Sequence, residues 1–224
     1  MIWKGAVFPV FKKLAVVGAG GLGRELMWQL HISCDGSTDI VGFYDDLPSL
    51  AGTDVNGMPV IGTVDMLADT DEDICAVLAV AEPSVRRSLY QRLCRNSHIS
   101  FPSVFAPNAV CSDTTAFGMG CIVCVGSVVT TNVRIGDFVI INPGCIIGHD
   151  CDIGSYSTLY PGAVVSGNVT LENGVQLGAR SCVIQGLRVG SGTFVGAGAA
   201  VVRDIPAGCT AGGVPARPKK FSAD

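Results

Sequence analysis

Apolar residues recur with a period of six in the second half of the chain. Every sixth residue from Phe117 to Val201 is apolar, and the residue two positions earlier is mostly small or β-branched, such as Ser127 or Ala163. This period fits neither the 3.6-residue turn of an α-helix nor the simple alternation of one long strand. It fits short strands joined by tight corners, with the aliphatic and the small side chain sharing the interior. We therefore predict a solenoid of stacked coils that bury one continuous core.

Glycine often follows the apolar position of the repeat. Because glycine has no Cβ, we expect these residues to give each corner a positive φ. A turn-dense solenoid also explains why the chain has 29 glycines among 224 residues. The glycines in question are Gly118, Gly136, Gly148, Gly154, Gly178, Gly190 and Gly196.

The first hundred residues follow a different pattern, that of a βαβ unit. Apolar strands are expected at residues 14–17, 40–44 and 74–80, and helices after residue 23 and from 84 to 94. Between the first strand and the first helix lies Gly18-Ala19-Gly20-Gly21-Leu22-Gly23, which is a complete G-x-G-x-x-G motif. Such glycines let the backbone approach a pyrophosphate at a helix N-terminus.

Two acidic residues, Asp45 and Asp46, follow the second strand. An acidic residue about 20 positions after the glycines belongs to the dinucleotide fingerprint, because it can accept hydrogen bonds from ribose hydroxyls. An NAD-dependent oxidoreductase is one interpretation. It is disfavoured because no second mononucleotide half precedes the repeats and because the motif fixes a binding geometry, not a reaction.

Composition narrows the class of protein. Residues are 48% hydrophobic and only 15% charged, so a substantial core is expected. The net charge of −4 argues against a nucleic-acid binder. No apolar run is long enough to cross a bilayer. The segment from Met1 to Lys13 leads directly into the first strand without a small-residue cleavage site, so we expect the first ten residues to be an arm and the protein to be cytoplasmic.

The cysteines do not indicate a metal site. Cys121 and Cys124 form a lone C-x-x-C, whereas a structural zinc takes four ligands. Cys145 and Cys151 occupy small inward positions of the repeat, so neither is expected to be a nucleophile. We therefore expect no metal.

His149 is the candidate catalytic residue. The chain has three histidines, and His31 and His98 are expected near helix ends at the surface. His149 is the only one in the repeats, and its place two residues after an inward position puts it at a corner. A neutral imidazole can take a proton near neutral pH, and the adjacent carboxylate of Asp150 can orient the ring.

The order of a G-x-G-x-x-G unit and a hexapeptide solenoid resembles one branch of the hexapeptide-repeat acyltransferases, over residues 14 to 218. That branch contains bacterial N-acetyltransferases of nucleotide-linked 4-amino sugars and sialic acid O-acetyltransferases. The resemblance implies a Rossmann-like α/β domain over residues 1–100 and an all-β left-handed β-helix over residues 101–224. It also implies acetyl-CoA as co-substrate and a homotrimer with active sites between subunits.

The resemblance assigns roles to residues by position. His149 is the implied general base, Asp150 its partner, and the backbone N–H of Gly167 the oxyanion donor. The implied sugar-nucleotide site consists of Gly18, Gly20, Gly21, Leu22, Asp45, Asp46, Ala81 and Glu82. The implied donor site consists of Gly167, Gly178, Ala179, Ala197, Pro215, Ala216 and Arg217. Leu22 and Thr158 depart from the family pattern, because the branch often carries histidine at the position of Leu22 and has its second histidine at the position of Thr158.

The sequence thus predicts transfer of an acetyl group from acetyl-CoA to the 4-amino group of a nucleotide-linked 4-amino-4,6-dideoxy sugar. The acceptor could be a UDP-linked bacillosamine-type precursor or GDP-perosamine. Acetylation of a sialic-acid-like hydroxyl is the alternative within the class, since the same base would serve an alcohol. Outside the class, a scaffold or regulatory binder remains, and it would bind no CoA.

Overall fold

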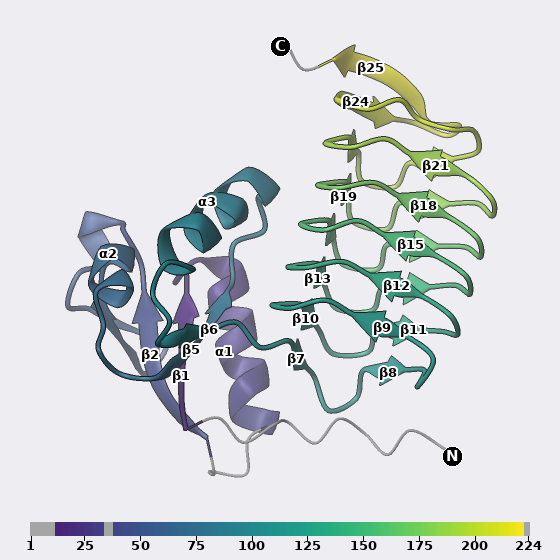
Figure 1. Cartoon of the computed structure of the whole chain (residues 1–224). Coiled ribbons are helices and arrows are strands. Elements are labelled where there is room, and N and C mark those ends of the chain that lie inside the picture. The colour runs from purple at the N-terminus through teal and green to yellow at the C-terminus, as the bar shows by residue number, and fades with distance from the viewer. Residues whose placement is uncertain (1–11, 34–37, 222–224) are drawn as a thin grey trace. The chain divides into compact units, whose positions relative to one another are not determined.

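The computed structural model describes residues 12–33 and 38–221, and the chain divides into two compact units between residues 104 and 105. The N-terminal unit is α/β (Figure 1). Its elements are β1 (Lys13–Val17), α1 (Gly21–Ser33), β2 (Asp39–Tyr44), the 3₁₀ helix η1 (Pro48–Leu50), β3 (Asp54–Val55), β4 (Met58–Gly62), α2 (Val64–Ala68), β5 (Ile74–Leu78), α3 (Pro83–Leu93) and β6 (Ile99–Ser100).

The sheet of this unit has the strand order β3-β4-β2-β1-β5-β6, and β1 pairs in parallel with β2 and β5. The apolar residues of β1 are at most 1% exposed, as expected for a central strand of a parallel sheet. Helix α1 approaches the end of β1 so closely that a Cβ on Gly23 would lie 1.9 Å from the Gly18 carbonyl oxygen. The predicted strand–glycine loop–helix unit is therefore confirmed.

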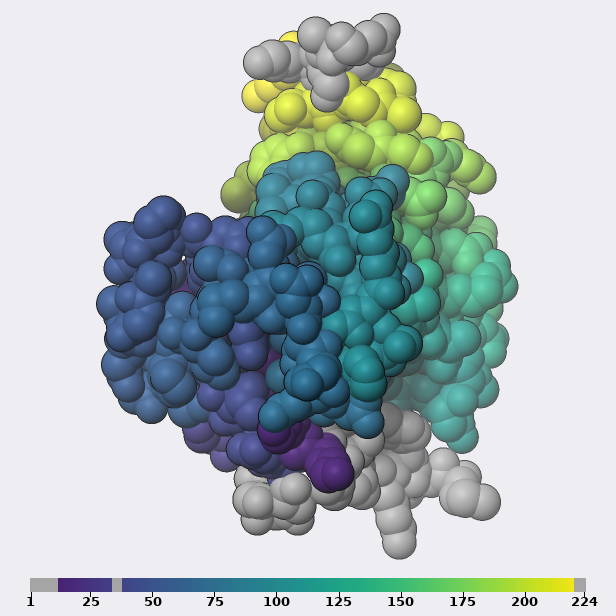
Figure 2. Space-filling view, turned by 60° about the vertical axis from the view of Figure 1, so that its left-hand side comes forward, coloured from purple at the N-terminus to yellow at the C-terminus, as the bar shows by residue number. Residues whose placement is uncertain are grey.

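The C-terminal unit is a left-handed β-helix of two-residue strands, each paired in parallel with the strand 18 residues later (Figure 1). The space-filling view shows its coils in order from teal to yellow toward the C-terminal end (Figure 2). The first sheet holds β7 (Val104–Phe105), β10 (Ile122–Val123), β13 (Ile140–Ile141), β16 (Thr158–Leu159), β19 (Gln176–Leu177), β22 (Phe194–Val195), β24 (Cys209–Gly212) and β25 (Arg217–Phe221). The second holds β8 (Val110–Cys111), β11 (Val128–Val129), β14 (Ile146–Ile147), β17 (Val164–Val165), β20 (Cys182–Val183) and β23 (Ala200–Val201). The third holds β9 (Ala116–Phe117), β12 (Arg134–Ile135), β15 (Asp152–Ile153), β18 (Thr170–Leu171) and β21 (Arg188–Val189).

The predicted inward positions form one core. The apolar residues of the six-residue repeat from Val123 to Val201 are at most 4% exposed and belong to a single cluster, with Phe117 packed against it. Small residues two positions earlier, such as Ala163, are buried in the same cluster. The antiparallel pair β24–β25 closes the C-terminal end of the stack.

The predicted role of the glycines after the apolar positions was wrong. Gly148 and Gly178 do not have positive φ; the corners take positive φ two residues further on, as at Gly120 and Asp150. What excludes a side chain is the next coil, because a Cβ on Gly148 would lie 2.7 Å from the nitrogen of Gly167. These glycines therefore permit coils to stack closely.

Two outer faces of the β-helix differ in polarity. The first residue of each strand points outward, because the second is in the core. On the second sheet, which we call the apolar face, no outward residue is charged, and Val110 and Ile146 are 59% and 45% exposed. These outward residues are Val110, Val128, Ile146, Val164, Cys182 and Ala200.

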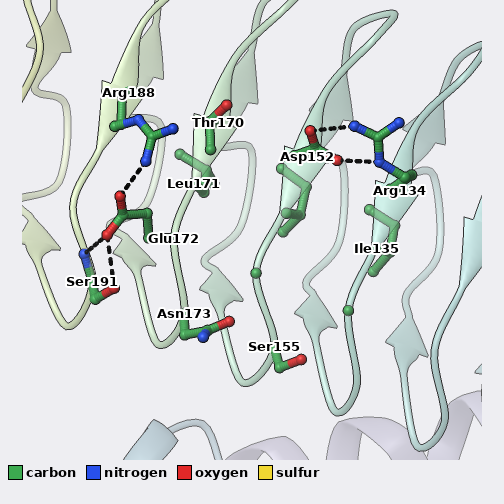
Figure 3. Close-up of a pocket in the computed structure, with 13 residues that line it drawn as sticks. Arg134, Ile135, Asp152, Ser155, Thr170, Leu171, Glu172, Asn173, Arg188 and Ser191 are labelled. Carbon is green, nitrogen blue, oxygen red and sulfur yellow. Dashed lines mark hydrogen bonds and ion pairs between the residues drawn. The ribbon is translucent and has the colours of Figure 1, made fainter.

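The third sheet, which we call the charged face, carries a groove of about 560 Å³ (Figure 3). Arg134 donates to both carboxylate oxygens of Asp152 on the next coil. Arg188 donates to Glu172, which also accepts from Ser191. Each arginine in this groove is therefore neutralised by a carboxylate of the same face.

Three columns of corners separate the faces. The His149 corner, between the apolar and the charged face, stacks residues 131–132, 149–150, 167–168 and 185–186. The Pro161 corner, on the other edge of the apolar face, stacks residues 143–144, 161–162, 179–180 and 197–198.

Candidate active site

The turn at His149 is held by the coils on both sides. The Asp150 amide donates to the Thr131 carbonyl at 3.1 Å, and the Asn168 amide donates to the His149 carbonyl at 2.7 Å. Asp150 has a φ of 58°, a left-handed conformation that aspartate visits more readily than most residues. With its backbone fixed in this way, the His149 side chain remains 65% exposed.

The His149 ring is oriented by its neighbour. Its Nδ1 lies 2.8 Å from Asp150 Oδ2, and Asn132 donates to Asp150 Oδ1 at 3.2 Å. The hydrogen bond from His149, and then that from Asn132, lowers the pKa of the Asp150 carboxyl below its ordinary value. An ionised carboxylate only accepts, so in the neutral ring Nδ1 carries the hydrogen and Nε2 presents the lone pair.

Gly167 sits against the ring on the next coil. A Cβ at this position would lie 2.5 Å from both Nε2 and Cε1 of His149, so only glycine fits without moving the ring. Within the described part of the chain, the Gly167 N–H has no hydrogen-bond acceptor. The basic nitrogen and a backbone donor of the next coil therefore belong to the same small region.

The other donor residues implied by resemblance lie elsewhere in the single chain. Ala179 and Ala197 are on the Pro161 corner, and Gly178 directly precedes that corner. Ala216 is buried in the C-terminal hairpin, after Pro215, and Arg217 donates to its carbonyl at 3.0 Å. One copy of the chain does not bring these residues together with His149.

The glycine loop of the N-terminal unit is fixed by Asp45. Gly18 has a φ of 100°, and the amides of Ala19 and Leu47 each donate to the Asp45 carboxylate at 2.8 Å. Gly20 and Gly21 have open space where a Cβ would be, as a loop that admits a ligand requires. A pocket of about 150 Å³ lies beside the loop. Its lining consists of Val17, Gly18, Tyr44, Asp45, Asp46, Val64, Val80, Val85 and Leu89.

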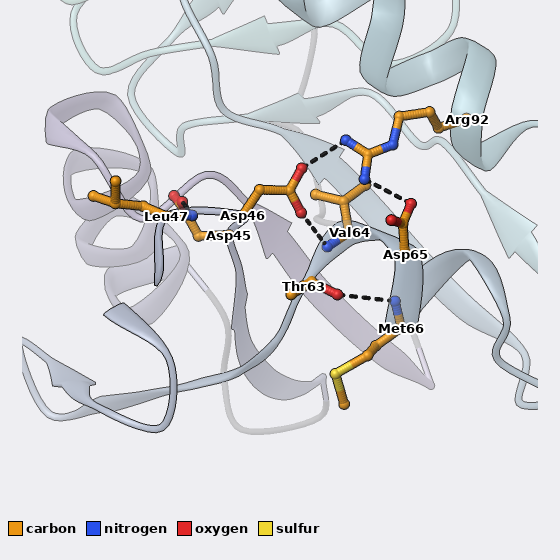
Figure 4. Close-up of polar contacts among 8 residues, drawn as sticks. All are labelled: Asp45, Asp46, Leu47, Thr63, Val64, Asp65, Met66 and Arg92. Carbon is orange, nitrogen blue, oxygen red and sulfur yellow. Dashed lines mark hydrogen bonds and ion pairs between the residues drawn. The ribbon is translucent and has the colours of Figure 1, made fainter. Parts of the chain in front are cut away.

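Asp46 is part of an internal network (Figure 4). It accepts from the Val64 amide at the start of α2 at 2.8 Å and from Arg92 of α3 at 2.6 Å. Arg92 donates to Asp65 as well, at 2.7 Å. The hydrogen bond from Arg92 is the main reason why the pKa of Asp46 lies below its ordinary value. The carboxylate therefore ties the end of β2 to both helices, and its contact with a ligand stays a prediction.

Arg86 was not predicted from the sequence as a residue of this site. It is fully buried on α3, and its Nη1 donates to the carbonyls of Val80 and Ala81 at 2.6 and 2.9 Å. It thereby shapes the segment after β5, where Ala81 and Glu82 are predicted to meet the nucleotide. A signal was available, because Arg86 lies at helical spacing from the buried Pro83 and Leu89.

The two departures from the family pattern lie in different units. Leu22 is the second residue of α1 and is partly buried. Thr158 is in β16 and is fully buried. Thr158 belongs to the same unit as His149, but it lies in a strand of the first sheet and not on the His149 corner.

Comparison with known proteins identifies both units. The PglD N-terminal domain family matches residues 13–93, and the bacterial transferase hexapeptide (six repeats) family matches residues 132–167. No curated protein sequence matches the chain. The acetyltransferase domain of PglB from Neisseria gonorrhoeae FA1090 is 33% identical, with a TM-score of 0.87, over 93% of this chain and 100% of that one.

Two further solved structures are similar over almost their whole length. PerB from Caulobacter crescentus is 29% identical, with a TM-score of 0.83, over 96% of this chain and 100% of its own. WeeI from Acinetobacter baumannii AYE is 32% identical, with a TM-score of 0.82, over 92% and 99%. The chain therefore belongs to the hexapeptide-repeat acetyltransferases that carry a PglD-type N-terminal domain.

Within the described residues, neither a cluster of metal ligands nor a membrane-spanning helix is present. No group of three or more His, Cys, Asp or Glu side chains there could hold a metal ion. Residues 12–33 and 38–221 also contain no helix that is both long and apolar enough to cross a membrane.

Proposed function

We propose that this protein transfers the acetyl group of acetyl-CoA to the amino group of a nucleotide-linked 4-amino-4,6-dideoxy sugar, with His149 as general base. The observation that carries the proposal is the arrangement of His149, Asp150 and Gly167. An oriented imidazole presents Nε2 beside a backbone N–H that has no acceptor in the described structure. Those are the two groups that acyl transfer from a thioester requires.

The reaction proceeds in one ternary complex. The sugar amine attacks the thioester carbonyl, forming a C–N bond, while His149 Nε2 accepts the amine proton. The Gly167 N–H donates to the oxyanion that develops on the carbonyl oxygen. Collapse breaks the C–S bond, and the proton passes from the imidazolium to the sulfur of CoA. Asp150 stabilises the transient imidazolium and keeps the ring in position.

No cysteine is required as an acyl carrier. Cys145 and Cys151 are buried inside the β-helix, as predicted from the repeat. Burial raises the pKa of the Cys145 thiol to about 12 and raises that of Cys151 above its ordinary value. The thiolate is the nucleophilic form of cysteine, and both residues disfavour it.

The acceptor assignment rests on the N-terminal unit and on the relatives. PglB has been solved with acetyl coenzyme A, and PerB with CoA and GDP-perosamine. PerB was also solved with one histidine replaced by asparagine or alanine, in the same complex. The open glycine loop and the 150 Å³ pocket beside Asp45 support a nucleotide site in this unit.

We propose that the active enzyme is a homotrimer. The apolar face has exposed residues such as Ile146 but no outward charge, which suits burial against other copies. If three copies turn this face toward a common axis, the His149 corner of each meets the Pro161 corner of the next. Such an arrangement brings Ala179 and Ala197 to the donor, which one chain alone does not do.

The trimer can be tested by the mass of the assembly in solution. Sedimentation equilibrium should give about three times the chain mass of 23.1 kDa. Ile146→Glu should produce a folded monomer without activity, because three carboxylates cannot be buried together at an apolar interface. Thr170→Glu on the charged face is the matched control and should remain trimeric. A monomeric wild-type protein with full activity contradicts the arrangement.

The decisive experiment follows free thiol released from acetyl-CoA. The acceptors are UDP-, GDP- and dTDP-linked 4-amino-4,6-dideoxy sugars, together with nucleotide-free sialic acid. Fast release with one nucleotide amino sugar is the expected result, and it identifies the nucleotide. Release with sialic acid alone would indicate that the protein is a sugar O-acetyltransferase. No release with any acceptor, and no binding of CoA, would contradict the proposed function.

A further inference from the structure

Arg180 occupies a place that is glycine in the other coils of its corner. The second residues of the Pro161 corner are Gly144, Gly162, Arg180 and Gly198, and all four have a left-handed backbone, with φ between 53° and 70°. A residue with a side chain is strained in this conformation, because its Cβ lies close to the following carbonyl oxygen. Glycine at position 180 would suit the turn better, so the arginine points to a task other than folding.

The Arg180 guanidinium is available to a partner outside the chain. The residue is exposed, and within the described residues it makes neither an ion pair nor a side-chain hydrogen bond. Its stem runs back toward the preceding coil, since a Cβ on Gly162 would lie 3.3 Å from its Cγ. There it borders a hollow of about 510 Å³, whose other lining consists of Pro143, Gly144, Pro161 and Gly162.

The two corners that border the apolar face are complementary in charge. Among the residues that form the Pro161 corner, Arg180 is the only ionisable one, and among those of the His149 corner only His149 and Asp150 are. In the trimer proposed above, the Pro161 corner of one copy meets the His149 corner of the next. A guanidinium in that contact loses water and therefore needs an acceptor. Asp150 is the one carboxylate that the opposite corner offers.

The heights of the two corners agree in that trimer. Copies related by an axis that runs along the β-helix present each residue at one height. The His149 turn and the Pro161 turn belong to the same coil, and Arg180 begins one coil further on, which is about 4.8 Å. Because its stem runs back toward the preceding coil, the guanidinium is directed to the level of the neighbouring copy's Asp150.

Asp150 has capacity for this partner. Its side chain is 53% exposed, and it accepts one hydrogen bond from Asn132 and one from His149. A carboxylate has about four lone-pair sites, so two remain. The turns directly before and after, residues 131–132 and 167–168, hold no charged side chain, and Asp152 on the following strand is neutralised by Arg134.

We propose that Arg180 of one copy pairs with Asp150 of the next copy and thereby holds the His149–Asp150 pair of the neighbouring active site in position. The proposal rests on the proposed function and on its trimer. Arg180 is a positioning residue, since it acts on the base through Asp150. A cation beside Asp150 also disfavours the imidazolium, so that His149 is neutral, and able to accept a proton, at lower pH. Each active site is then complete only after assembly.

The first test needs no substrate. The chain has three histidines, so the signals of His149 can be assigned by their loss in His149→Ala and titrated by NMR in the assembled protein. Arg180→Gly should raise the pKa of His149, because it removes the neighbouring cation. It should still fold, since it gives this turn the residue that Gly144, Gly162 and Gly198 already have at the same φ. Arg180→Lys should give an intermediate pKa, because it keeps the charge but not the planar fork.

Arg203→Gln is the control for charge in this titration. It removes an exposed arginine three coils away from His149, a separation of about 14 Å at which surface charges are largely screened. The pKa of His149 should not change. Equal values for the wild type and Arg180→Gly overturn the proposal, as does a wild-type protein that is monomeric in sedimentation equilibrium.

The second test separates action within a chain from action between chains. Arg180→Gly should lower turnover about tenfold, the scale of one charge-assisted hydrogen bond, and leave the KM for acetyl-CoA unchanged. Trimers reassembled from Arg180→Gly and His149→Ala chains should be several times more active than the mean of the two parents, because an Arg180→Gly chain then receives Arg180 from its neighbour. Mixed trimers that show no such gain overturn the proposal. A wild-type protein whose His149 titrates as expected, but which releases no CoA with any acceptor, contradicts the proposed function and leaves the pairing intact.

Discussion

Replacing His149 with alanine should lower turnover by about 10²–10⁴-fold, the usual scale for the loss of a general base. The affinity for acetyl-CoA should remain nearly unchanged, because the imidazole acts on the amine proton and not on the donor. The side chain is 65% exposed, so its removal leaves no buried cavity and the fold should be retained. The measurement is steady-state kinetics with the acceptor identified by the thiol assay, with CoA affinity determined separately.

Two further variants should be compared with His149→Ala. His98→Ala removes a histidine that also pairs with a carboxylate, that of Asp73 at 2.8 Å, but in the other unit. It should keep full activity. Asp150→Asn keeps a side-chain oxygen near Nδ1 but removes the charge that stabilises the imidazolium. Its turnover should therefore lie between that of His149→Ala and that of His98→Ala. A fully active His149→Ala enzyme would eliminate the assignment of the base.

Gly167→Ala should lower turnover by about 10²-fold or more, although it adds a single methyl group. The new Cβ would lie 2.5 Å from Nε2 and Cε1 of His149, and ordinary contact begins near 3.4 Å. The exposed ring can swing away at little cost in stability. The variant should therefore remain folded, with its melting temperature near that of the wild type, while its base is misplaced.

Gly196→Ala is the matched control for this substitution. Gly196 also lies in the β-helix at an ordinary φ, but a Cβ there meets its nearest atom, the Ala211 carbonyl oxygen, at 3.5 Å. It should leave turnover unchanged. If Gly167→Ala is as active as Gly196→Ala, the ring of His149 does not need the position that the structure gives it, and the proposed oxyanion donor loses its support.

The acidic residues after β2 have a structural task in addition to the ligand contact that was predicted for them. Asp45 and Asp46 were predicted as ligand contacts from their place after the second strand. In the structure Asp45 accepts from two backbone amides, and Asp46 accepts from Val64 and Arg92. A carboxylate has about four lone-pair sites, so these bonds leave room for a ribose hydroxyl. Substitutions here will alter the shape of the loop as well as any direct contact.

The sequence by itself determined the fold and the identity of the candidate base. The six-residue period from Phe117 to Val201 is incompatible with helix or plain strand, and each coil can bury its apolar residue only by stacking on the next. The G-x-G-x-x-G motif between an apolar strand and a helix predicted the local strand–loop–helix unit, although by itself it is a weaker signal than the repeat. A single histidine at a corner position, followed by aspartate, was sufficient to name His149 and Asp150.

Only the tertiary structure decided what these residues meet across coils. A period in the sequence gives no distances, so the close approach of Gly167 to the His149 ring and the buried hydrogen bonds of Arg86 could not be read from it. The glycines after the apolar positions were misinterpreted for the same reason. Their need for glycine comes from the backbone of the coil 18 residues later, a contact that exists only once the coils have stacked.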